Sequence, residues 1–365
     1  MADQSYPGGN NGNNSNGGNG VNASGLDVLF LQDFTGSQQP YIDKARAQIH
    51  TICTTLTTDG NFAPGGLRFG VVAFRDHVPQ DSSFVTKALT PVPNSNPPQV
   101  TFTTDPSVVA SVLNTLTAAG GGDGPEASAD ALQMAVQANW NANATKVTIL
   151  ITDAPPHGLG ETGDGFPDGC PLQIEPQRMA KSMARIGITL YVIACEPTLS
   201  SDYKQAHAFY EGITATTGGK VYELGDSINL QHFIRAAAVE TIDQEAIVSR
   251  HGDAVRSLIS QNANASNAEI AKKLQAHFAA QNVQMRTLNF DRIVEESSVS
   301  DAARVWFETD TLAQGRARIH HLGSGASSRI RSHYSAGGSQ PAPTISNTPI
   351  SFHQIQGIVQ KVRMR

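Results

Sequence analysis

The sequence predicts an α/β fold with a doubly wound, mostly parallel six-stranded sheet that has helices on both faces. Two observations predict it. Near-continuous apolar runs of strand length recur between residues 26 and 245, as expected for strands that are buried on both faces. Segments with the spacing of amphipathic helices separate these runs, and this alternation is typical of parallel sheets with crossover helices.

The predicted strands are short apolar runs bounded by polar or turn-forming residues. Five segments share this character: 26–34, 67–74, 146–154, 188–195 and 220–224. Residues 76–98 are rich in proline, which a central strand does not tolerate, so they are expected to leave the sheet. We expect a short edge strand to follow this excursion, near Val100–Thr103.

The predicted helices lie between these strands. Six segments have helical periodicity: 41–56, 105–116, 125–140, 176–186, 203–217 and 228–246. The second begins with Asp105-Pro106, and proline is favoured in the first turn of a helix because an N–H there has no intrahelical partner. Each helix is therefore expected to cross between neighbouring strands of the sheet.

The chain of 365 residues is longer than one typical domain, and its composition changes along its length. Residues 1–25 are a Gly/Asn/Ser tract with too few apolar residues to form a core, so we expect a disordered tail. Residues 26–245 are the predicted α/β domain. Residues 246–365 are predicted to form a smaller α+β or β-rich unit with a Gly/Ser/Pro-rich loop at 322–345.

Within the C-terminal region, helices and strands are both expected. Residues 254–258 and 268–278 have helical spacing, whereas 283–290 and 304–309 resemble short alternating strands. The last segment, 350–365, alternates apolar and polar residues well enough for one or two further strands.

Composition excludes some partners. The net charge is −6, and no basic face that could follow a phosphate backbone is evident, so nucleic acid is not expected as a partner. No apolar run approaches the ~18 residues that span a bilayer. The N-terminal sequence MADQSYPGGNNGNN has neither the basic nor the apolar segment of a secretory signal. The expected location is the cytoplasm.

The cysteines are interpreted as buried free thiols. Cys53, Cys170 and Cys195 are the only three in the chain, and none has the CxxC or Cys/His spacing of a zinc site. Cys53 falls in a predicted helix and Cys195 ends a predicted strand. A disulfide framework is not expected, which agrees with a reducing compartment.

Oxygen-bearing side chains follow three separate segments that reach the same edge of the predicted sheet. The first strand ends in Asp33-x-Thr35-x-Ser37, the strand at 146–154 contains Asp153, and the loop before the helix at 125 ends in Glu126. In an open α/β sheet, ligands bind outside the carboxyl ends of the strands. These side chains are therefore expected to converge there.

This set resembles the metal-ion-dependent adhesion site of the von Willebrand factor A family, over residues 26–245. The resemblance implies that the hydroxyl oxygens of Thr35 and Ser37 bind Mg²⁺ directly, with Asp33 and Asp153 close to it and partly bridged by water. Mg²⁺ prefers near-octahedral oxygen coordination at ~2.0–2.1 Å, and Mn²⁺ is also compatible. Neutral ligands leave the ion able to attract a carboxylate from a protein partner, so the implied function is binding and not catalysis.

The third loop resembles a subgroup of this family. Asp123-Gly-Pro125-Glu126 is similar to the Asp-x-Pro-Glu found in the A-type domains of integrin β chains, in which the glutamate serves the central ion. The subgroup implies a second cation, such as Ca²⁺, held by Asp76 and Asp123 together with Glu126. The third integrin-type site has no counterpart, because Gln38-Gln39-Pro40 stands in its place.

Plainer interpretations of these residues stay open. Asp33 and Ser37 are also suited to cap the following helix, Asp123 to a turn, and Glu126 to the first turn of a helix. His157 is more simply interpreted as a loop side chain turned to solvent. The acidic loop residues are more simply interpreted as solvated; they are Glu161, Asp164 and Asp168.

Within the family, the chain resembles a narrower group, the A-type domains found beside atypical α-kinases in amoebae and fungi. It rests on Ala73-Phe-Arg-Asp-His77, on GGGDGPE at 120–126 and on Thr152-Asp-Ala-Pro-Pro-His-Gly158. Thr311-Leu-Ala-Gln-Gly-Arg316 faintly resembles the opening of such a kinase, but too few residues follow it, without zinc-binding cysteines or a glycine-rich loop. We therefore expect a non-enzymatic binding module; the alternatives are a self-assembling structural protein and a regulatory remnant of such a kinase.

Overall fold

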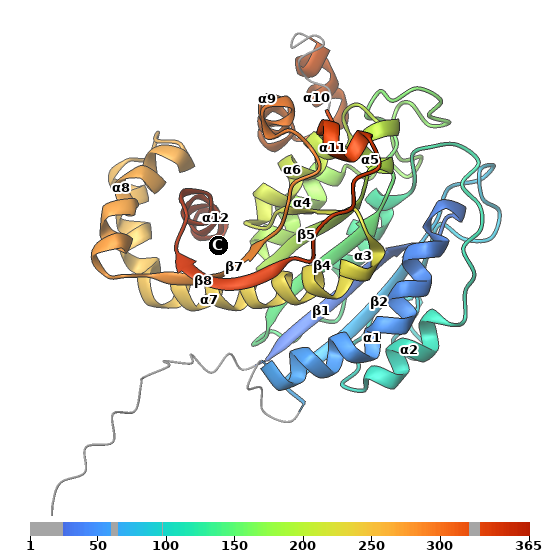
Figure 1. The fold of residues 1–365 in the computed structure, drawn as a ribbon, viewed down its shortest axis with the longest axis horizontal. Helices are drawn as coiled ribbons and strands as arrows, with labels where there is room; N and C mark the ends of the chain where they lie inside the picture. The colour runs from blue at the N-terminus through green and yellow to red at the C-terminus, as the bar shows by residue number, and fades with distance from the viewer. Residues whose placement is uncertain (1–24, 60–64, 97, 321–328) are drawn as a thin grey trace, which may run out of the picture.

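The computed structural model of the protein describes residues 25–59, 65–96, 98–320 and 329–365. Its centre is a sheet with strand order β3-β2-β1-β4-β5-β6 (Figure 1). The strands are β1 (Leu26–Asp33), β2 (Leu67–Phe74), β3 (Thr86–Ala88), β4 (Thr145–Thr152), β5 (Ile188–Cys195) and β6 (Val221–Leu224). Only β3 is antiparallel to its neighbour. The predicted doubly wound, mostly parallel six-stranded sheet is confirmed.

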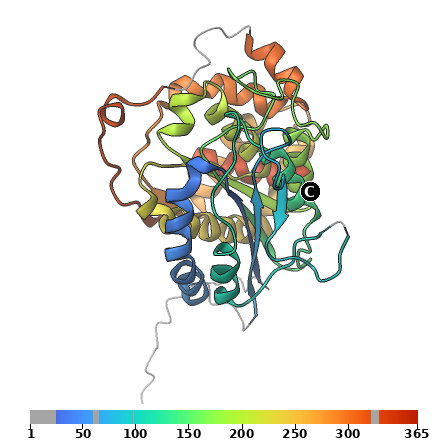
Figure 2. The same cartoon turned by 90° about the vertical axis from the view of Figure 1, so that its right-hand side faces the viewer.

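Helices cover both faces of this sheet. They are α1 (Gln39–Asp59), α2 (Pro106–Leu113), α3 (Ser128–Gln137), α4 (Pro176–Arg185), α5 (Thr198–Asp202), α6 (Ala206–Thr217) and α7 (Leu230–Gln261), with 3₁₀ turns η1 (Gly36–Gln38) and η2 (Ser227–Asn229). One face packs against α1, α2 and α7, and the other against α3, α4 and α6. Figure 2 shows α1, in blue, beside the strands.

Each face of the sheet has its own hydrophobic core. Along β1, Leu26, Val28 and Phe30 belong to one core, and Leu29 and Leu31 belong to the other. Successive side chains of a strand point to opposite faces, so a strand between two helical layers must be apolar at nearly every position. This requirement explains the unbroken apolar runs in the sequence.

The predicted position of the edge strand was wrong. The strand is Thr86–Ala88, and Val100–Thr103 contributes only isolated bridges, such as that between Thr103 and Phe69. Thr90 explains the arrangement: its Oγ1 accepts a hydrogen bond from the backbone amide of Val71 and donates to the carbonyl of Thr101. The chain after β2 therefore runs beside that strand at two places. Only the first, Thr86–Ala88, pairs with β2 as a strand.

The C-terminal region is α+β, as one of the two predicted alternatives stated. Its elements are α8 (Asn267–Ala280), β7 (Gln284–Asn289), α9 (Glu296–Glu308), α10 (Leu312–Ile319), α11 (Ser332–Ser335), β8 (Thr344–Pro349) and α12 (Phe352–Met364). β7 and β8 form a small antiparallel sheet. The helices predicted at 254–258 and 268–278 lie within α7 and α8, and the strand predicted at 283–290 is β7.

Two strand predictions in this region were wrong. Residues 304–309 lie mostly in α9, and 350–365 form α12. α12 begins with a capping box, in which Ser351 and Gln354 each bond the backbone amide of the other. Its buried residues also follow a helical spacing: Ile355, Ile358, Val359 and Val362. Over so short a segment, this spacing resembles the alternation of a strand.

Helix α7 joins the two parts of the chain. It runs without a break from Leu230 to Gln261, through the domain boundary predicted between residues 245 and 246. Beyond the boundary, Ile247 and Val255 of α7 enter a third core together with residues of α8, β7 and α12. Figure 1 shows α8 and α12 together at the end of the molecule away from α1 and α2. The division into two domains stays a prediction.

Three further predictions concern segments between or outside these elements. Except for Gly25, the tail predicted at 1–25 lies outside the described residues, as does 322–328 of the predicted loop. The rest of that loop contains α11 and the start of β8. All three cysteines are buried and free, as predicted. Among the described residues, no helix is both long and apolar enough to cross a membrane.

Candidate metal centre

The predicted ligands lie where β1 and β4, the two central strands, end side by side. Asp33 is the last residue of β1 and Thr152 the last of β4. The hydroxyl of Thr152 donates a hydrogen bond to Oδ2 of Asp33 at 2.7 Å, and Asp153 follows directly. The pairing of parallel strands thus brings together two side chains that are 119 residues apart. Sequence analysis did not identify Thr152 as a positioning residue.

The loop after β1 joins this group by local hydrogen bonds. The backbone amide and the hydroxyl of Thr35 donate to Oδ1 of Asp33, at 2.9 and 2.6 Å. The hydroxyl of Ser37 donates to Oδ1 of Asp153 at 3.0 Å. The capping alternative is not supported, because these oxygens bond the loop and Asp153 and no side chain caps η1. Four of the predicted ligands therefore form two hydrogen-bonded pairs at the ends of neighbouring strands.

Glu126 reaches the same group from the third loop. Its amide donates to the carbonyl of Pro155 at 2.8 Å, which holds the loop against the end of β4. A Cβ on Gly121 would lie 2.9 Å from Oε1 of Glu126 and 3.4 Å from Cβ of Thr35, and Gly121 has a φ of +80°. Both facts require glycine there. Glu126 precedes α3, which begins at Ser128, so the first-turn alternative was wrong.

These carboxylates are buried without basic partners. Asp33, Asp153 and Glu126 are 0, 4 and 3% exposed, and within the described ranges none of them forms an ion pair. Burial, and then repulsion from neighbouring acids, raises the pKa of Asp33 to about 7 and that of Glu126 to about 11. Burial also raises the pKa of Asp153. Oε2 of Glu126 has no hydrogen-bond partner.

Such a group fits a hard divalent cation. Isolated buried carboxylates are strongly disfavoured unless they are paired or bind a metal. All the donor atoms here are carboxylate or hydroxyl oxygens, the ligands that Mg²⁺ and Mn²⁺ take. A cation at this point would satisfy Glu126 and relieve the repulsion between Asp33 and Asp153.

A second cluster lies beside the first, around His157. Its Nε2 is 2.6 Å from Oδ1 of Asp76, and its Nδ1 is 2.8 Å from Oδ1 of Asp164. Asp123 accepts a hydrogen bond from the amide of Gly165, and ligand atoms of Asp123, His157 and Asp164 lie within 4.8 Å of one another. Oδ2 of Asp76 and Oδ1 of Asp123 are buried without partners. The two predicted second-cation residues are thus close together.

The interpretation of His157 as a solvent-exposed side chain was wrong. It is 2% exposed; although burial lowers its pKa, hydrogen bonds to Asp164 and Asp76 outweigh this and raise the value to about 9. Glu161 is not simply solvated either, since it accepts hydrogen bonds from the amides of Lys204 and Gln205. Hydrogen bonds of His157 and Glu161 therefore hold the acidic loop against the edge of the site.

The C-terminal region also contacts this loop. Arg316 of α10 donates hydrogen bonds to the carbonyls of Gly158 and Pro167. Leu312 of α10 is buried, and its side chain lies close to Gly158 and Gly169. Residues that the sequence placed in a separate unit thus support the loop beside the candidate metal centre.

Comparisons with known proteins agree with the predicted family. Residues 27–160 match the family model described as the von Willebrand factor A domain. Over 168 residues, the chain is 26% identical to the alpha-protein kinase vwkA of Dictyostelium discoideum. The match covers 46% of this chain and 24% of that protein, so the chain spans about a quarter of this curated relative's length.

Solved structures similar to the chain include three proteins of low identity. A von Willebrand factor type A protein from Catenulispora acidiphila has a TM-score of 0.40 at 18% identity, over 60% of this chain and 43% of that one. The pilus adhesin SpaC of Lactobacillus rhamnosus GG has a TM-score of 0.42 at 12% identity, over 61% of this chain and 30% of that one. Proximal thread matrix protein 1 of the mussel byssus has a TM-score of 0.37 at 16% identity, over 59% of this chain and 47% of that one.

Proposed function

The part of this chain that matches the family model is a von Willebrand factor A domain, and we propose that it binds a protein partner through a bound metal ion. In this proposal one Mg²⁺ ion, replaceable by Mn²⁺, lies among the oxygens of the five predicted ligands: Asp33, Thr35, Ser37, Glu126 and Asp153. An open position on the ion accepts a carboxylate of the partner. The function is binding and not catalysis.

The observation that supports the proposal is the buried carboxylate group without a basic partner. Several other buried acids of the described chain pair with basic side chains, as Glu223 does with Arg292, and Glu196 accepts two hydrogen bonds from Ser200. At the strand ends, Asp33 and Glu126 face other acids instead. A divalent ion supplies the missing positive charge, and the neutral hydroxyls of Thr35 and Ser37 leave part of that charge for the partner's carboxylate.

The hydroxyl groups are placed to serve as ligands. Those of Thr35 and Ser37 donate their protons to Asp33 and Asp153, at 2.6 and 3.0 Å. Their lone pairs remain for a cation, and the carboxylates hold the orientation, as outer ligands commonly do at metal sites. This arrangement suits capture of an anionic group.

A second cation, such as Ca²⁺, belongs to the same proposal. Its ligands are Asp76 and Asp123, each of which has one buried oxygen without a partner. Neither pairs with an arginine: Arg75 pairs with Asp81 and Arg68 with Asp27. The ion would offset the repulsion that Asp76 adds to Asp123, whose pKa burial and Asp76 raise to about 6. It would orient Glu126 toward the first ion.

Affinity capture tests the function. The immobilised full chain should retain a partner from native extract in the presence of Mg²⁺, and EDTA should elute it. Asp33→Asn should lose this capture. Asp253→Asn removes an acid whose side chain is 98% exposed on α7 and is the matched control, expected to bind like the wild type.

Two results would contradict the proposal. One is a partner that stays bound in EDTA, and the other is equal capture by Asp33→Asn and the wild type. Light scattering with and without EDTA identifies the case in which the partner is a second copy of this chain.

A further inference from the structure

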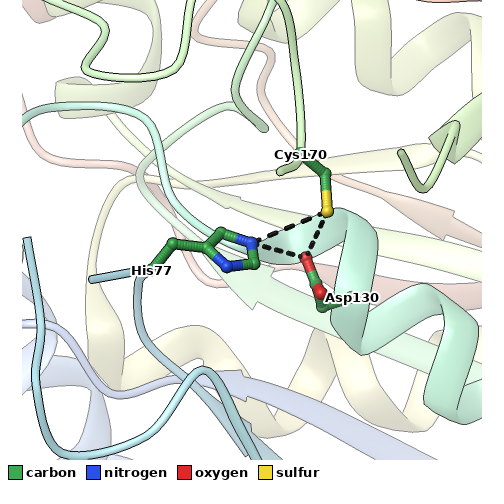
Figure 3. A group of neighbouring side chains, drawn as sticks. All are labelled: His77, Asp130 and Cys170. Atoms are coloured by element: carbon green, nitrogen blue, oxygen red, sulfur yellow. Dashed lines mark hydrogen bonds and ion pairs between the residues drawn. The ribbon is translucent and has the colours of Figure 1, made fainter. Parts of the chain in front are cut away.

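Another group of side chains that could hold a metal ion shares no residue with the carboxylate centre or with the cluster around His157. His77 follows β2, Asp130 lies in the first turn of α3, and Cys170 comes from the loop between β4 and α4. Figure 3 shows the imidazole, the carboxylate and the thiol pointing toward one another. One ligand atom from each lies within 4.8 Å of the others.

The distances between these atoms match those around a tetrahedral zinc ion. Nε2 of His77 is 3.0 Å from Oδ2 of Asp130 and 3.6 Å from Sγ of Cys170, and Sγ is 3.3 Å from the same carboxylate oxygen. Zinc–ligand bonds of about 2.0–2.3 Å at tetrahedral angles place ligand atoms about 3.3–3.6 Å apart. Movements of a few tenths of an ångström would suffice to admit the ion.

Two backbone amides face the sulfur of Cys170, whereas burial and a neighbouring acid oppose its charged form. The backbone amide of Leu172 donates to Sγ at 3.3 Å, and a hydrogen bond from the amide of Ile174 also stabilises the charged sulfur. Without a cation, burial and then the charge of Asp130 oppose ionisation and raise the pKa of the thiol to about 11. A metal ion removes both obstacles, because it binds the thiolate and neutralises Asp130.

The donor set also indicates which ion binds. Sulfur and imidazole are poor ligands for Mg²⁺ but good ones for Zn²⁺. All three side chains are buried, with exposures of 5% for His77, 5% for Asp130 and 7% for Cys170. Phe166 packs edge-on against His77 at 5.7 Å between ring centroids.

We propose that His77, Asp130 and Cys170 bind one Zn²⁺ ion, with a water molecule as the fourth ligand. Binding releases the thiol proton to solvent, since only the thiolate is a metal ligand. The ion joins three segments that are distant in sequence: the end of β2, helix α3 and the acidic loop. His77 is next to Asp76, so zinc also stabilises the edge of the carboxylate centre without being part of it.

Cobalt substitution tests the zinc site in the full chain. Protein stripped with a chelator is titrated with Co²⁺ in saturating Mg²⁺, so that the oxygen site is filled. We expect one equivalent to produce a thiolate-to-cobalt absorption band and the visible bands of a tetrahedral ion, and Zn²⁺ to remove both. Cys170→Ser should lose the thiolate band, and Cys53→Ser, a change of another buried thiol, should keep it.

A second readout needs no variant. Zn²⁺ should slow the alkylation of Cys170, measured by mass spectrometry in mild denaturant, and should slow it more than the alkylation of Cys53. Asp33→Asn should retain zinc, which separates this site from the proposed binding function. The absence of a thiolate band in the wild type, its persistence in Cys170→Ser, or equal alkylation with and without Zn²⁺ would overturn the proposal.

Discussion

Two buried glutamates near the sheet have opposite surroundings. Glu223 in β6 accepts hydrogen bonds from Arg292 and from the amide of Val294, each at 2.9 Å, and lies 3.2 Å from Nε2 of His207. Burial raises its pKa, but His207 and then Arg292 outweigh burial and lower the value to about 2. Glu126 is equally buried, yet burial and neighbouring acids raise its pKa to about 11.

The difference distinguishes a structural acid from a functional one. Glu223 has its counter-charges within the chain and joins β6 to the segment before α9. Glu126 has none in the described residues, and in the proposed site a bound ion supplies its counter-charge. The same residue type, buried in both places, holds the fold together at Glu223 and, in the proposed function, binds an ion at Glu126.

The largest change in the free energy of unfolding is expected for Glu223, the acid that has its counter-charges within the chain. Glu223→Gln should lower the free energy of unfolding by about 3–5 kcal/mol, because the fully buried His207 loses its acidic partner and Arg292 keeps only Glu211. Glu211→Gln, which removes a half-buried partner of the same arginine, should cost below about 1 kcal/mol. Urea denaturation at pH 7 measures both. Equal losses in the two variants would mean that burial does not distinguish these acids.

The corresponding substitution of Glu126 should change the free energy of unfolding in the opposite direction. In EDTA at pH 7, Glu126→Gln should raise the free energy of unfolding by about 1–3 kcal/mol, because the amide mimics the protonated acid without the free-energy cost of binding a proton. Mg²⁺ should raise the free energy of unfolding of this variant much less than that of the wild type. A destabilised metal-free variant would show that Glu126 has a partner of its own.

Metal should stabilise the native protein by mass action. At a hundredfold excess over Kd, Mg²⁺ or Mn²⁺ should add about 2.7 kcal/mol and raise the melting temperature. Asp33→Asn should abolish this rise, and Asp253→Asn should retain it. Thermal unfolding with and without EDTA is the measurement, and an undiminished metal response in Asp33→Asn would argue against the site.

The raised pKa values also predict a pH dependence. A carboxyl whose pKa is higher in the folded chain stabilises the fold at low pH and loses that contribution as pH rises. For Asp33 the loss begins near the unfolded value of 3.8 and continues through about 7. Metal-free protein should therefore gain stability from this group toward acidic pH, whereas Mg²⁺ should bind more tightly as pH rises from 6 to 8 and should release protons.

Calorimetry in two buffers of different ionisation enthalpy measures that proton release. The heats of Mg²⁺ binding should differ between the buffers at pH 7, because binding displaces protons from Asp33 and Glu126. Identical heats at every pH would mean that the carboxylates are already ionised without metal.

The smallest expected effect concerns the second cation. Asp76→Asn should remove the heat of Ca²⁺ binding at the second site and weaken partner capture only a few-fold, because the residue acts by orienting Glu126. Asp33→Asn should eliminate capture. If the wild type shows a single heat of binding in Ca²⁺, Asp76 and Asp123 serve only to anchor His157 and Gly165.

Sequence reasoning succeeded where local pattern and topology determine position. Asp33, Thr35 and Ser37 belong to one short motif at a strand end, and Asp153 follows the neighbouring strand. It failed for His157, whose burial depends on Asp164 and on a loop held by Arg316 from the C-terminal region.

Other failures have different physical origins. The pairing of His77 with Cys170 spans 93 residues and arises only when the acidic loop folds over the end of the sheet. The segment 350–365 formed a helix because its capping box and its contacts with α8 outweigh a weak alternation. Long-range packing, which a single short pattern does not encode, decided the pairing of His77 with Cys170, whereas the capping box of the helix is a local signal that the sequence contains.

The most direct test of the central claim is diffraction from crystals of the full chain grown with Mn²⁺. We expect an anomalous peak among the oxygens of Asp33, Thr35, Ser37, Glu126 and Asp153, with the hydroxyls of Thr35 and Ser37 as direct ligands. A well-ordered strand edge without a peak, or with Glu126 turned toward a lysine or arginine in place of an ion, would contradict it.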